Sequence, residues 1–184
     1  MPRLFIGIGL PDIYRQSLSP LIEDVSGLTD ASVNWSKLSS WHLTLKFLGE
    51  TDEAHIPAIR HALAAVDFTA FTMRAGGAGA FPDAGRPKVL WLGLTEGREQ
   101  CAALARSIED ALAAIGVPRE KKPFRPHLTL GRVRKPGPGD WKTLLDHAAA
   151  TNWPAFPVNE FILWQSVLDP AGAIHTPLVR YPLG

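Results

Sequence analysis

Two short segments of the chain carry the same four residues, and their types suit proton transfer. The sequence His-Leu-Thr-Leu occurs at 42–45 and again at 127–130, each time within an apolar run typical of a β-strand. Because alternate residues of a strand point to the same face, each histidine is predicted to share a face with the threonine two positions later. The two His–Thr pairs are therefore interpreted as two halves of one site.

A single copy of this pattern would carry little weight. A histidine in an apolar strand is often a core residue whose ring is held by a hydrogen bond, and threonine is a common strand residue. Two copies of four identical residues, however, are not expected by chance in a chain of 184 residues. The repeat therefore favours the functional interpretation.

Two histidines and two threonines can catalyse an in-line displacement at a phosphodiester. With an ordinary pKa near 6.5, one ring can accept a proton from an attacking hydroxyl or water, while the other donates a proton to the leaving oxygen. The threonine hydroxyls point into the same space, where they can donate hydrogen bonds to anionic oxygens. This chemistry requires no metal.

Other reaction types fit the sequence less well. No two histidines have the His-x-x-x-His spacing of a zinc site, and the one carboxylate near either motif, Glu50, lies beyond the end of the first strand. A Gly-x-Ser-x-Gly elbow is absent, and a serine mechanism would leave the second histidine unexplained. We therefore expect neither a metal nor a cofactor.

The positive charge of the chain is concentrated around the second motif. The net charge is only +1, so any contact with nucleic acid must come from a local patch. Seven cations lie at 119–135, with Glu120 the one acidic residue among them: Arg119, Lys121, Lys122, Arg125, Arg132, Arg134 and Lys135. Either they attract phosphates, or they form solvated loops on both sides of a strand. Arg125 shares strand parity with His127, whereas Arg132 would reach the site only if the strand bulged or ended at Gly131.

The composition is that of a globular protein with one sizeable core. Hydrophobic residues make up 46% of the chain and charged residues 20%. The single cysteine, Cys101, excludes an internal disulfide and a cysteine-based zinc site, and is interpreted as a small core residue. The chain shows neither the apolar segment of a secretion signal nor a run of about 20 apolar residues that could cross a bilayer. A cytoplasmic protein is therefore expected.

The apolar pattern predicts an α+β protein in which strands and helices alternate. Strands are predicted at 3–10, 33–37, 41–48, 68–74, 89–94, 125–133, 159–168 and 175–183. Helices are predicted at 12–25, 52–66, 98–115 and 141–150, the first burying Ile13, Leu18, Leu21, Ile22 and Val25. The glycine-rich segment 76–79 lacks the ending of a phosphate-binding loop and is predicted to bend or bulge, and a turn is predicted at 169–172. The chain 1–184 is expected to form a single domain of two similar lobes, with one motif from each half.

Five segments together resemble the 2H phosphoesterase superfamily, and more closely its RNA 2′,3′-cyclic phosphodiesterases, also called 2′-5′ RNA ligases. The segments are Arg-Leu-Phe-Ile-Gly-Ile at 3–8, His-Leu-Thr-Leu-Lys-Phe-Leu-Gly at 42–49, Gly-Ala-Phe-Pro at 79–82, Val-Leu-Trp-Leu-Gly at 89–93 and Phe-Arg-Pro-His-Leu-Thr-Leu-Gly-Arg at 124–132. The resemblance implies a bilobal α+β fold with two antiparallel-sheet lobes, helices outside and a central cleft that both motif strands face.

The resemblance also implies an activity. It is metal-independent hydrolysis of a 2′,3′-cyclic phosphate at an RNA 3′ end to a 2′-phosphate, accompanied by a reverse 2′-5′ RNA ligase activity. His42 is implied as the proton donor to the leaving ribose oxygen, and His127 as the proton acceptor from water. Thr44 and Thr129 are implied to hold phosphate oxygens, as is Arg132, the arginine after the second motif. The residues alone leave open which histidine is the acid, because a near-symmetric cleft accepts a substrate in either orientation.

Three further positions bear on the site. Arg125 is a weaker phosphate-binding candidate than Arg132, and Phe47 either stacks on a base or packs in the core. His175 stands where the resembling proteins often have a tyrosine, which puts the substrate preference in question.

Two alternatives to this activity remain open. One is a 2H phosphodiesterase for another small cyclic or 2′-5′ phosphodiester, and the other is a non-catalytic protein that binds RNA ends. The expected partners are RNA 3′ ends or small nucleotides with a 2′,3′-cyclic phosphate. We expect no membrane or obligate protein partner, and a monomer.

Overall fold

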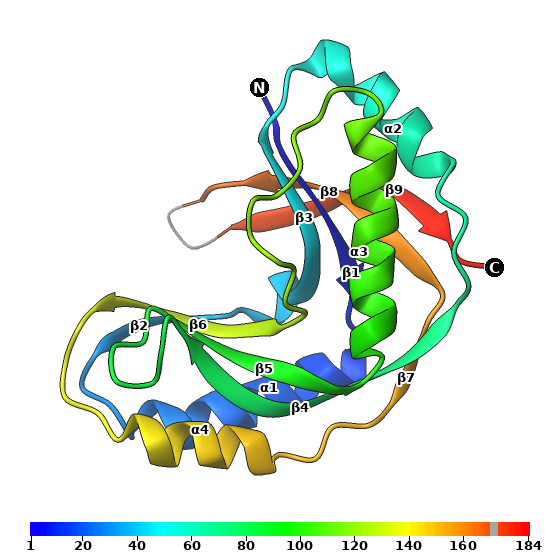
Figure 1. Cartoon of the computed structure of the whole chain (residues 1–184). Coiled ribbons are helices and arrows are strands. Elements are labelled where there is room, and N and C mark those ends of the chain that lie inside the picture. Colours follow the sequence, from blue (N-terminus) through cyan, green and yellow to red (C-terminus); the bar gives the residue numbers. More distant parts are fainter. Residues whose placement is uncertain (170–172) are drawn as a thin grey trace.

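A single curled antiparallel sheet organises the computed structural model, which describes residues 1–169 and 173–184 (Figure 1). Within these residues the strand order is β7-β4-β5-β6-β3-β1-β8-β9, and β2 pairs with β6 outside this path. The strands are β1 Arg3–Gly9, β2 Ser32–Trp35, β3 His42–Glu50, β4 Phe71–Phe81, β5 Val89–Glu96, β6 Leu128–Lys135, β7 Phe156–Val158, β8 Glu160–Val167 and β9 Ile174–Pro182.

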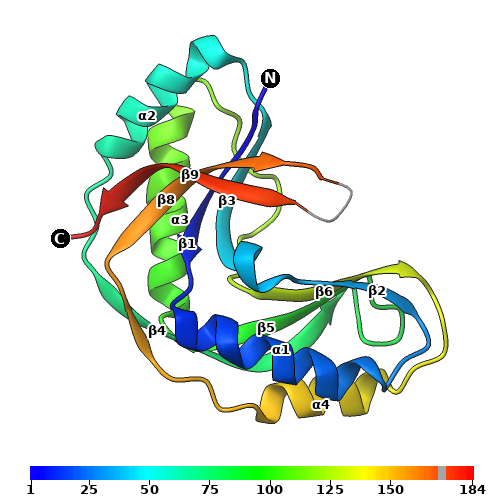
Figure 2. The ribbon, with the colours of Figure 1, turned by 180° about the vertical axis from the view of Figure 1, so that it is seen from behind.

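The helices cover the outside of the curved sheet in two pairs (Figures 1 and 2). α2 packs on α3, which lies against β3, and α1 packs on α4, which lies against β4 and β5. The α-helices are α1 Asp12–Ser26, α2 Ile56–Ala64, α3 Arg98–Ala113 and α4 Trp141–Ala150, and two 3-10 turns, η1 Leu38–Ser40 and η2 Glu53–His55, precede β3 and α2. The predicted α+β, bilobal fold class is confirmed.

The two lobes meet where β3 pairs with β6. We call β3, β1, β8 and β9 with α2 and α3 the upper lobe, and β2, β4, β5, β6 and β7 with α1 and α4 the lower lobe. Each lobe contains one motif strand, but the lobes are not the two halves of the chain. The early strands β4 and β5 lie beside β6, and the late strands β8 and β9 lie beside β1. This exchange makes both lobes depend on the whole chain.

The core lies between the sheet and its helices and explains most of the local structure. β1 is central to the upper lobe and is almost entirely apolar, and α3 buries one stripe that includes Cys101, as predicted. In α1 the prediction is wrong at one position. Ile13 is 51% exposed, and Tyr14 is fully buried in its place. The Tyr14 hydroxyl donates to the carbonyl of Pro154 and accepts from the amide of Ala75, so a polar tip is satisfied inside the core.

Several predicted boundaries shift. β6 begins at Leu128, so His127 precedes the strand, and β7 has no counterpart among the predicted strands. The glycine-rich segment lies inside β4, where the register with β5 shifts between Ala75 and Ala78, so the predicted bulge is confirmed but falls within one strand. A Cβ at Gly79 would come within 2.3 Å of the Trp91 ring, so glycine there lets the indole lie across β4. The turn predicted at 169–172 falls on residues 170–172, outside the described part of the chain.

Candidate active site

The two motifs face each other across the junction of the lobes. Leu43 of β3 pairs with Leu128 of β6 in antiparallel register, and both leucines are fully buried. Residues next to these leucines point to the opposite face. Both histidines and both threonines are only partly buried, as expected for side chains that line a surface. The pairing of the two central leucines therefore brings the four predicted side chains to one face of the sheet.

The His42 ring is held at both nitrogens. Nδ1 lies 2.7 Å from the carbonyl oxygen of Ser40, which can only accept, so Nδ1 carries a proton and donates it. Nε2 lies 2.9 Å from Oγ1 of Thr44. In the neutral ring Nε2 is the acceptor, and the threonine hydroxyl donates to it.

The His127 ring is held in the same way at one nitrogen only. Nδ1 lies 2.7 Å from the carbonyl oxygen of Arg125, two residues earlier, and therefore donates to it. Among the described residues nothing bonds to Nε2 of His127. Arg125 contributes its backbone here, and its side chain is exposed. Both rings thus have the same tautomer, with Nε2 left for chemistry.

A repeated β-bulge follows each motif. The pairing of β5 with β6 passes from Trp91–Thr129 to Leu90–Gly131, which leaves Leu130 as an extra residue. The pairing of β1 with β3 skips Leu45 in the same way. An extra residue reverses the side to which every later side chain points.

The bulges bring two more side chains to the cleft side of the sheet. The condition under which Arg132 reaches the site is met, and its charge lies close enough to both histidines to lower the pKa of each. Phe47 holds the equivalent position after the first motif and is 59% exposed, so it is not a core residue.

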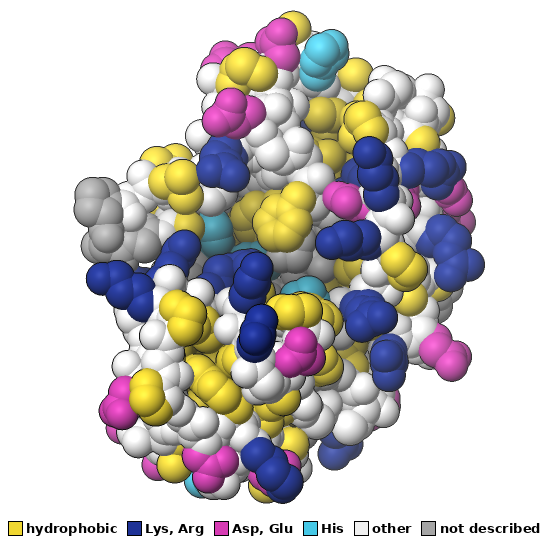
Figure 3. Space-filling view, turned by 60° about the vertical axis from the view of Figure 1, so that its left-hand side comes forward, with side chains coloured by type: hydrophobic (Ala, Val, Ile, Leu, Met, Phe, Trp, Pro, Cys, Tyr) yellow, Lys and Arg dark blue, Asp and Glu magenta, His cyan; other side chains and the backbone are white. Residues whose placement is uncertain are grey.

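Aromatic rings border each histidine, and of these the sequence indicated only His175 as a site residue. The His42 ring contacts the rings of Phe5 at 4.5 Å and His175 at 5.0 Å between centroids. The His127 ring contacts the rings of Phe81 at 5.2 Å and Trp91 at 6.5 Å. Strand pairings of high sequence separation make these contacts, so no local pattern could have revealed them. In the space-filling view, histidine side chains lie in a hollow with Lys and Arg around it (Figure 3).

Burial and positive charge keep both histidines neutral. Burial is the largest cause that lowers the pKa of His42 to about 4, followed by the charges of His175, Arg132 and His127, whereas the bond to Ser40 opposes the shift. The pKa of His127 is lowered first by burial and then by Arg132. Burial also lowers the pKa of His175. An excess of positive charge around two neutral imidazoles suits an anionic ligand.

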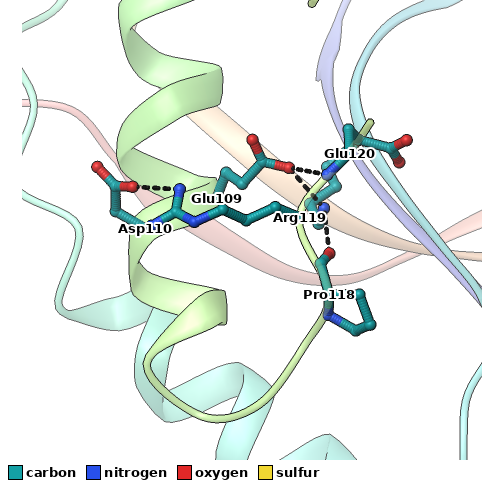
Figure 4. A network of polar contacts seen from close by, with 6 residues as sticks. Glu109, Asp110, Pro118, Arg119 and Glu120 are labelled. Carbon is teal, nitrogen blue, oxygen red and sulfur yellow. Dashed lines mark hydrogen bonds and ion pairs between the residues drawn. The ribbon is translucent and has the colours of Figure 1, made fainter. Parts of the chain in front are cut away.

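An ion pair between buried Lys46 and partly exposed Glu109 holds the segment that leads to His127 (Figure 4). Nζ of Lys46, a residue only 4% exposed, donates to Oε1 of Glu109 at 2.9 Å and to the carbonyl oxygen of Pro118 at 3.0 Å. The same Oε1 accepts from the amide of Glu120 at 2.6 Å. Arg119 pairs with Asp110. This network fastens the segment after α3 to the strand that carries His42, so it links the two halves of the site.

Hydrogen bonds also fix the backbone of Thr129, in the second motif. The carbonyl oxygen of Thr129 accepts from Oγ of Ser36 at 2.6 Å and from Nε1 of Trp41 at 2.8 Å. Trp41 directly precedes the first motif, and this position is the one sequence signal for its bond to Thr129.

In the described ranges, no group of three or more His, Cys, Asp or Glu side chains is arranged to hold a metal ion. No helix in those ranges is long and apolar enough to span a bilayer.

Fold and site together define a class: an α+β phosphoesterase with two His–Thr motifs on one sheet face. A model of the 2′-5′ RNA ligase superfamily matches residues 20–170 of the chain. The chain belongs to this superfamily, as the resemblance predicted.

Relatives of known name agree with this assignment. A protein of Archaeoglobus fulgidus is 34% identical over 176 residues, which cover 96% of this chain and 97% of the relative. One of Thermus thermophilus is 32% identical over 197 residues, covering 98% and 90%. Both are named RNA 2′,3′-cyclic phosphodiesterase.

Solved structures share the fold over almost the whole chain. TT0787 of Thermus thermophilus superposes with a TM-score of 0.79 at 27% identity, covering 98% of this chain and 97% of the other. E. coli LigT in complex with 3′-AMP gives a TM-score of 0.76 at 28% identity, covering 99% and 98%.

Proposed function

We propose that this chain is an RNA 2′,3′-cyclic phosphodiesterase that works by two-histidine acid/base catalysis. The observation that carries the proposal is the matched pair of rings. Nδ1 of His42 and of His127 each donate to the backbone carbonyl two residues earlier, so Nε2 is the proton-transfer atom of both rings, bonded to Thr44 in His42 alone. The charge of Arg132 acts on both rings. The names of the relatives supply the substrate class.

The proposed step is an in-line displacement at phosphorus. Water attacks the phosphorus of the 2′,3′-cyclic phosphate as Nε2 of His127 accepts a proton from it. The bond from phosphorus to O3′ breaks, and protonated Nε2 of His42 donates its proton to O3′. The product carries a 2′-phosphate and a 3′-hydroxyl. Thr44, Thr129 and Arg132 donate to the phosphate oxygens, where negative charge builds up.

A difference between the two lobes supports one assignment of the two roles. The leaving oxygen belongs to the ribose, so the acid lies on the nucleoside side and the base on the water side. Phe47 offers an exposed aromatic ring in the upper lobe, where a nucleoside can stack. Nε2 of His127 has no partner in the described part of the chain, whereas Nε2 of His42 is already bonded to Thr44. His42 is therefore assigned as the acid and His127 as the base.

Substrate binding supplies the charge balance that proton transfer needs. In the free protein the surrounding cations disfavour an imidazolium. A bound phosphodiester carries one negative charge, which offsets that of Arg132 and raises the pKa of both rings. A proton is then held on a histidine ring beside the bound phosphate. Because all of these groups come from one chain, 1–184, a monomer acting as one domain is sufficient.

Reverse 2′-5′ ligation follows from the same geometry. If a ribose 5′-hydroxyl takes the place of water, His127 deprotonates it and a 2′-5′ linkage forms. Incubation of a 2′,3′-cyclic-phosphate strand with a 5′-hydroxyl strand tests this, with a new 2′-5′ junction as the expected product.

The decisive experiment follows the opening of a 2′,3′-cyclic-phosphate RNA end in the presence of EDTA. The wild type is expected to form the 2′-phosphate, and His42→Ala and His127→Ala to lose about 10²–10⁴ in rate while keeping the wild-type thermal unfolding curve. Binding of the RNA end without product would favour the non-catalytic alternative. Turnover of only another cyclic or 2′-5′ phosphodiester would favour the alternative of a 2H phosphodiesterase with a different small substrate. Loss of activity with EDTA would contradict metal independence.

A further inference from the structure

A group of unpaired cations extends from the site along the outer end of the lower lobe. We define the basic patch as Arg86 and Lys88 of the β4–β5 turn with Arg134 and Lys135 of β6, all exposed. In the described part of the chain no carboxylate pairs with any of them, although six other Lys and Arg side chains form ion pairs: Arg15, Lys46, Arg74, Arg119, Lys142 and Arg180. The four cations of the patch are therefore free of ion pairs within the described residues.

Strand pairing places the two parts of the patch side by side. Arg132 pairs with Val89, and the amide of Val133 donates to the carbonyl oxygen of Lys88 at 3.0 Å. Lys88 therefore flanks the strand segment that carries Arg134. Pairing between distant segments thus brings the backbones of the β4–β5 turn and the outer end of β6 together, which the cluster of cations at 119–135 did not reveal.

The patch is continuous with the candidate active site at both of its parts. Along β6, Arg134 follows Arg132 by two residues, which is about 7 Å along a strand. The β4–β5 turn starts at Phe81, whose ring contacts the ring of His127 at 5.2 Å between centroids. The amide of Lys88 donates to the carbonyl oxygen of Phe81 at 2.7 Å and closes this turn. A ligand bound between the histidines would therefore meet the patch as soon as it extended outward.

One carboxylate, Asp83, lies in the same turn and offsets one of the four positive charges of the patch. Its Oδ1 accepts from the amides of Gly85 at 2.8 Å and Arg86 at 3.0 Å, so it serves to shape the turn. The other cations around the site are partly neutralised. Arg119 pairs with Asp110, whereas Lys121, Lys122 and Arg125 form no ion pair within the described residues. Position distinguishes the basic patch from these cations, because it continues β6 beyond Arg132 and includes the turn that starts at Phe81.

We propose that the basic patch binds the sugar–phosphate backbone of the RNA strand upstream of the cyclic phosphate. This proposal rests on the proposed function, because a strand that ends in a 2′,3′-cyclic phosphate can leave the site only in the upstream direction. Exposed cations without partners attract phosphates independently of base sequence. The patch makes the enzyme favour an RNA end over a cyclic mononucleotide with the same reacting group.

The test compares two substrates that differ only in the upstream strand. One is adenosine 2′,3′-cyclic monophosphate, and the other is an oligoribonucleotide of about ten nucleotides with the same terminal group. In the double variant Lys88→Ala/Arg134→Ala, KM for the oligonucleotide should rise about tenfold or more at low salt, while kcat and KM for the mononucleotide stay unchanged. The slope of log(kcat/KM) against log salt should fall by about 0.7 for each lost phosphate contact. The loss should be equal for adenine-rich and uracil-rich strands.

A matched control removes the same charge elsewhere. Arg98→Ala/Arg106→Ala takes two exposed cations from α3, in the upper lobe, and is expected to leave both substrates unaffected. Thermal unfolding of both double variants checks that the fold is intact, and Lys88→Gln/Arg134→Gln repeats the test with side chains that still donate.

The results separate the two proposals. Wild-type turnover of the mononucleotide with no change in the oligonucleotide KM of the Lys88/Arg134 variant would overturn the role of the patch alone. An equal loss with both substrates would also overturn it, since the patch would then act on the site and not on the strand. Failure of the wild type to open either substrate would overturn the proposed function and this inference together.

Discussion

The two halves of the site share a backbone plan and differ in nearly every contact around it. In each half a histidine donates from Nδ1 to the carbonyl two residues earlier, and a bulge follows the threonine. Beyond the bulge the halves diverge. Lys46 is buried and ion-paired, whereas a Cβ on the equivalent Gly131 would lie 2.7 Å from a Val33 methyl group of β2. The next positions carry Phe47 and Arg132.

This difference makes the two histidines of a near-symmetric site chemically unequal. The upper half-site binds its own threonine hydroxyl and is bordered by Phe5 and His175, so Nε2 of His42 is shielded. The lower half-site leaves Nε2 of His127 free of partners among the described residues. In the proposed mechanism His42 therefore faces the nucleoside and His127 faces water. Four predictions test whether the two histidines are unequal, beginning with the largest expected effect.

The histidine variants should respond differently to the leaving group. His42→Ala and His127→Ala are each expected to lose about 10²–10⁴ in kcat on a normal 2′,3′-cyclic phosphate. A substrate with sulfur in place of O3′ expels a thiolate that needs no proton. Steady-state kinetics with this substrate should restore most of the activity of His42→Ala and none of that of His127→Ala. Rescue of His127→Ala would reverse the assigned roles.

The threonine variants should separate phosphate binding from control of the acid. Each of Thr44→Val and Thr129→Val removes one hydrogen bond to an anionic oxygen, which is expected to cost about 10–100-fold in kcat/KM. Only Thr44→Val also removes a bond to a catalytic ring, so only this variant should shift the pH profile. Parallel pH profiles of both variants check this, and identical profiles would mean that the Thr44 bond to His42 has no catalytic consequence.

The pH dependence should differ between the free protein and the complex. In the free protein the pKa of His42 is lowered to about 4 and that of His127 is below its ordinary 6.5. The productive form holds one proton on the pair, so kcat/KM should peak below pH 6.5 and fall about tenfold per pH unit above the pKa of His127. The bound phosphate raises both pKa values, so kcat should peak at higher pH. A kcat/KM that still rises above pH 7.5 would contradict this electrostatic account.

The smallest effect is expected at His175. Protonated His175 opposes the protonation of His42, whereas neutral His175 does not. His175→Phe keeps an aromatic ring but removes the charge, so it should match the wild type at pH 8. Relative to the wild type it should become about two- to fivefold more active as the pH falls below the pKa of His175. The measurement is the ratio of the variant's kcat/KM to that of the wild type, taken at pH 8 and at pH 5. His175→Tyr is a second neutral control. A ratio that does not change with pH would show that the two rings are not coupled.

Much of the site is predictable from residues that lie close together in the sequence. The repeat of His-Leu-Thr-Leu indicates two strands with a polar and an apolar face, because strand alternation depends only on neighbouring residues. The histidine and threonine of each strand are two residues apart, so their shared face is also predictable, and their types indicate acid/base chemistry on a phosphodiester. The α+β class and most of the helices follow from apolar periodicity.

Features that depend on partners distant in the chain come from the folded structure. Strand alternation alone places Arg132 on the wrong face, because the bulge at Leu130 arises from pairing with β5 and reverses the parity beyond it. The exchange of strands between the lobes, the contact of His175 with His42 and the bond from the Val133 amide to the Lys88 carbonyl are likewise products of long-range pairing. The order of residues along the chain defines which groups can react. Sheet register decides which of them meet, because a side chain's face is set by local alternation but its neighbours are set by the strand across from it.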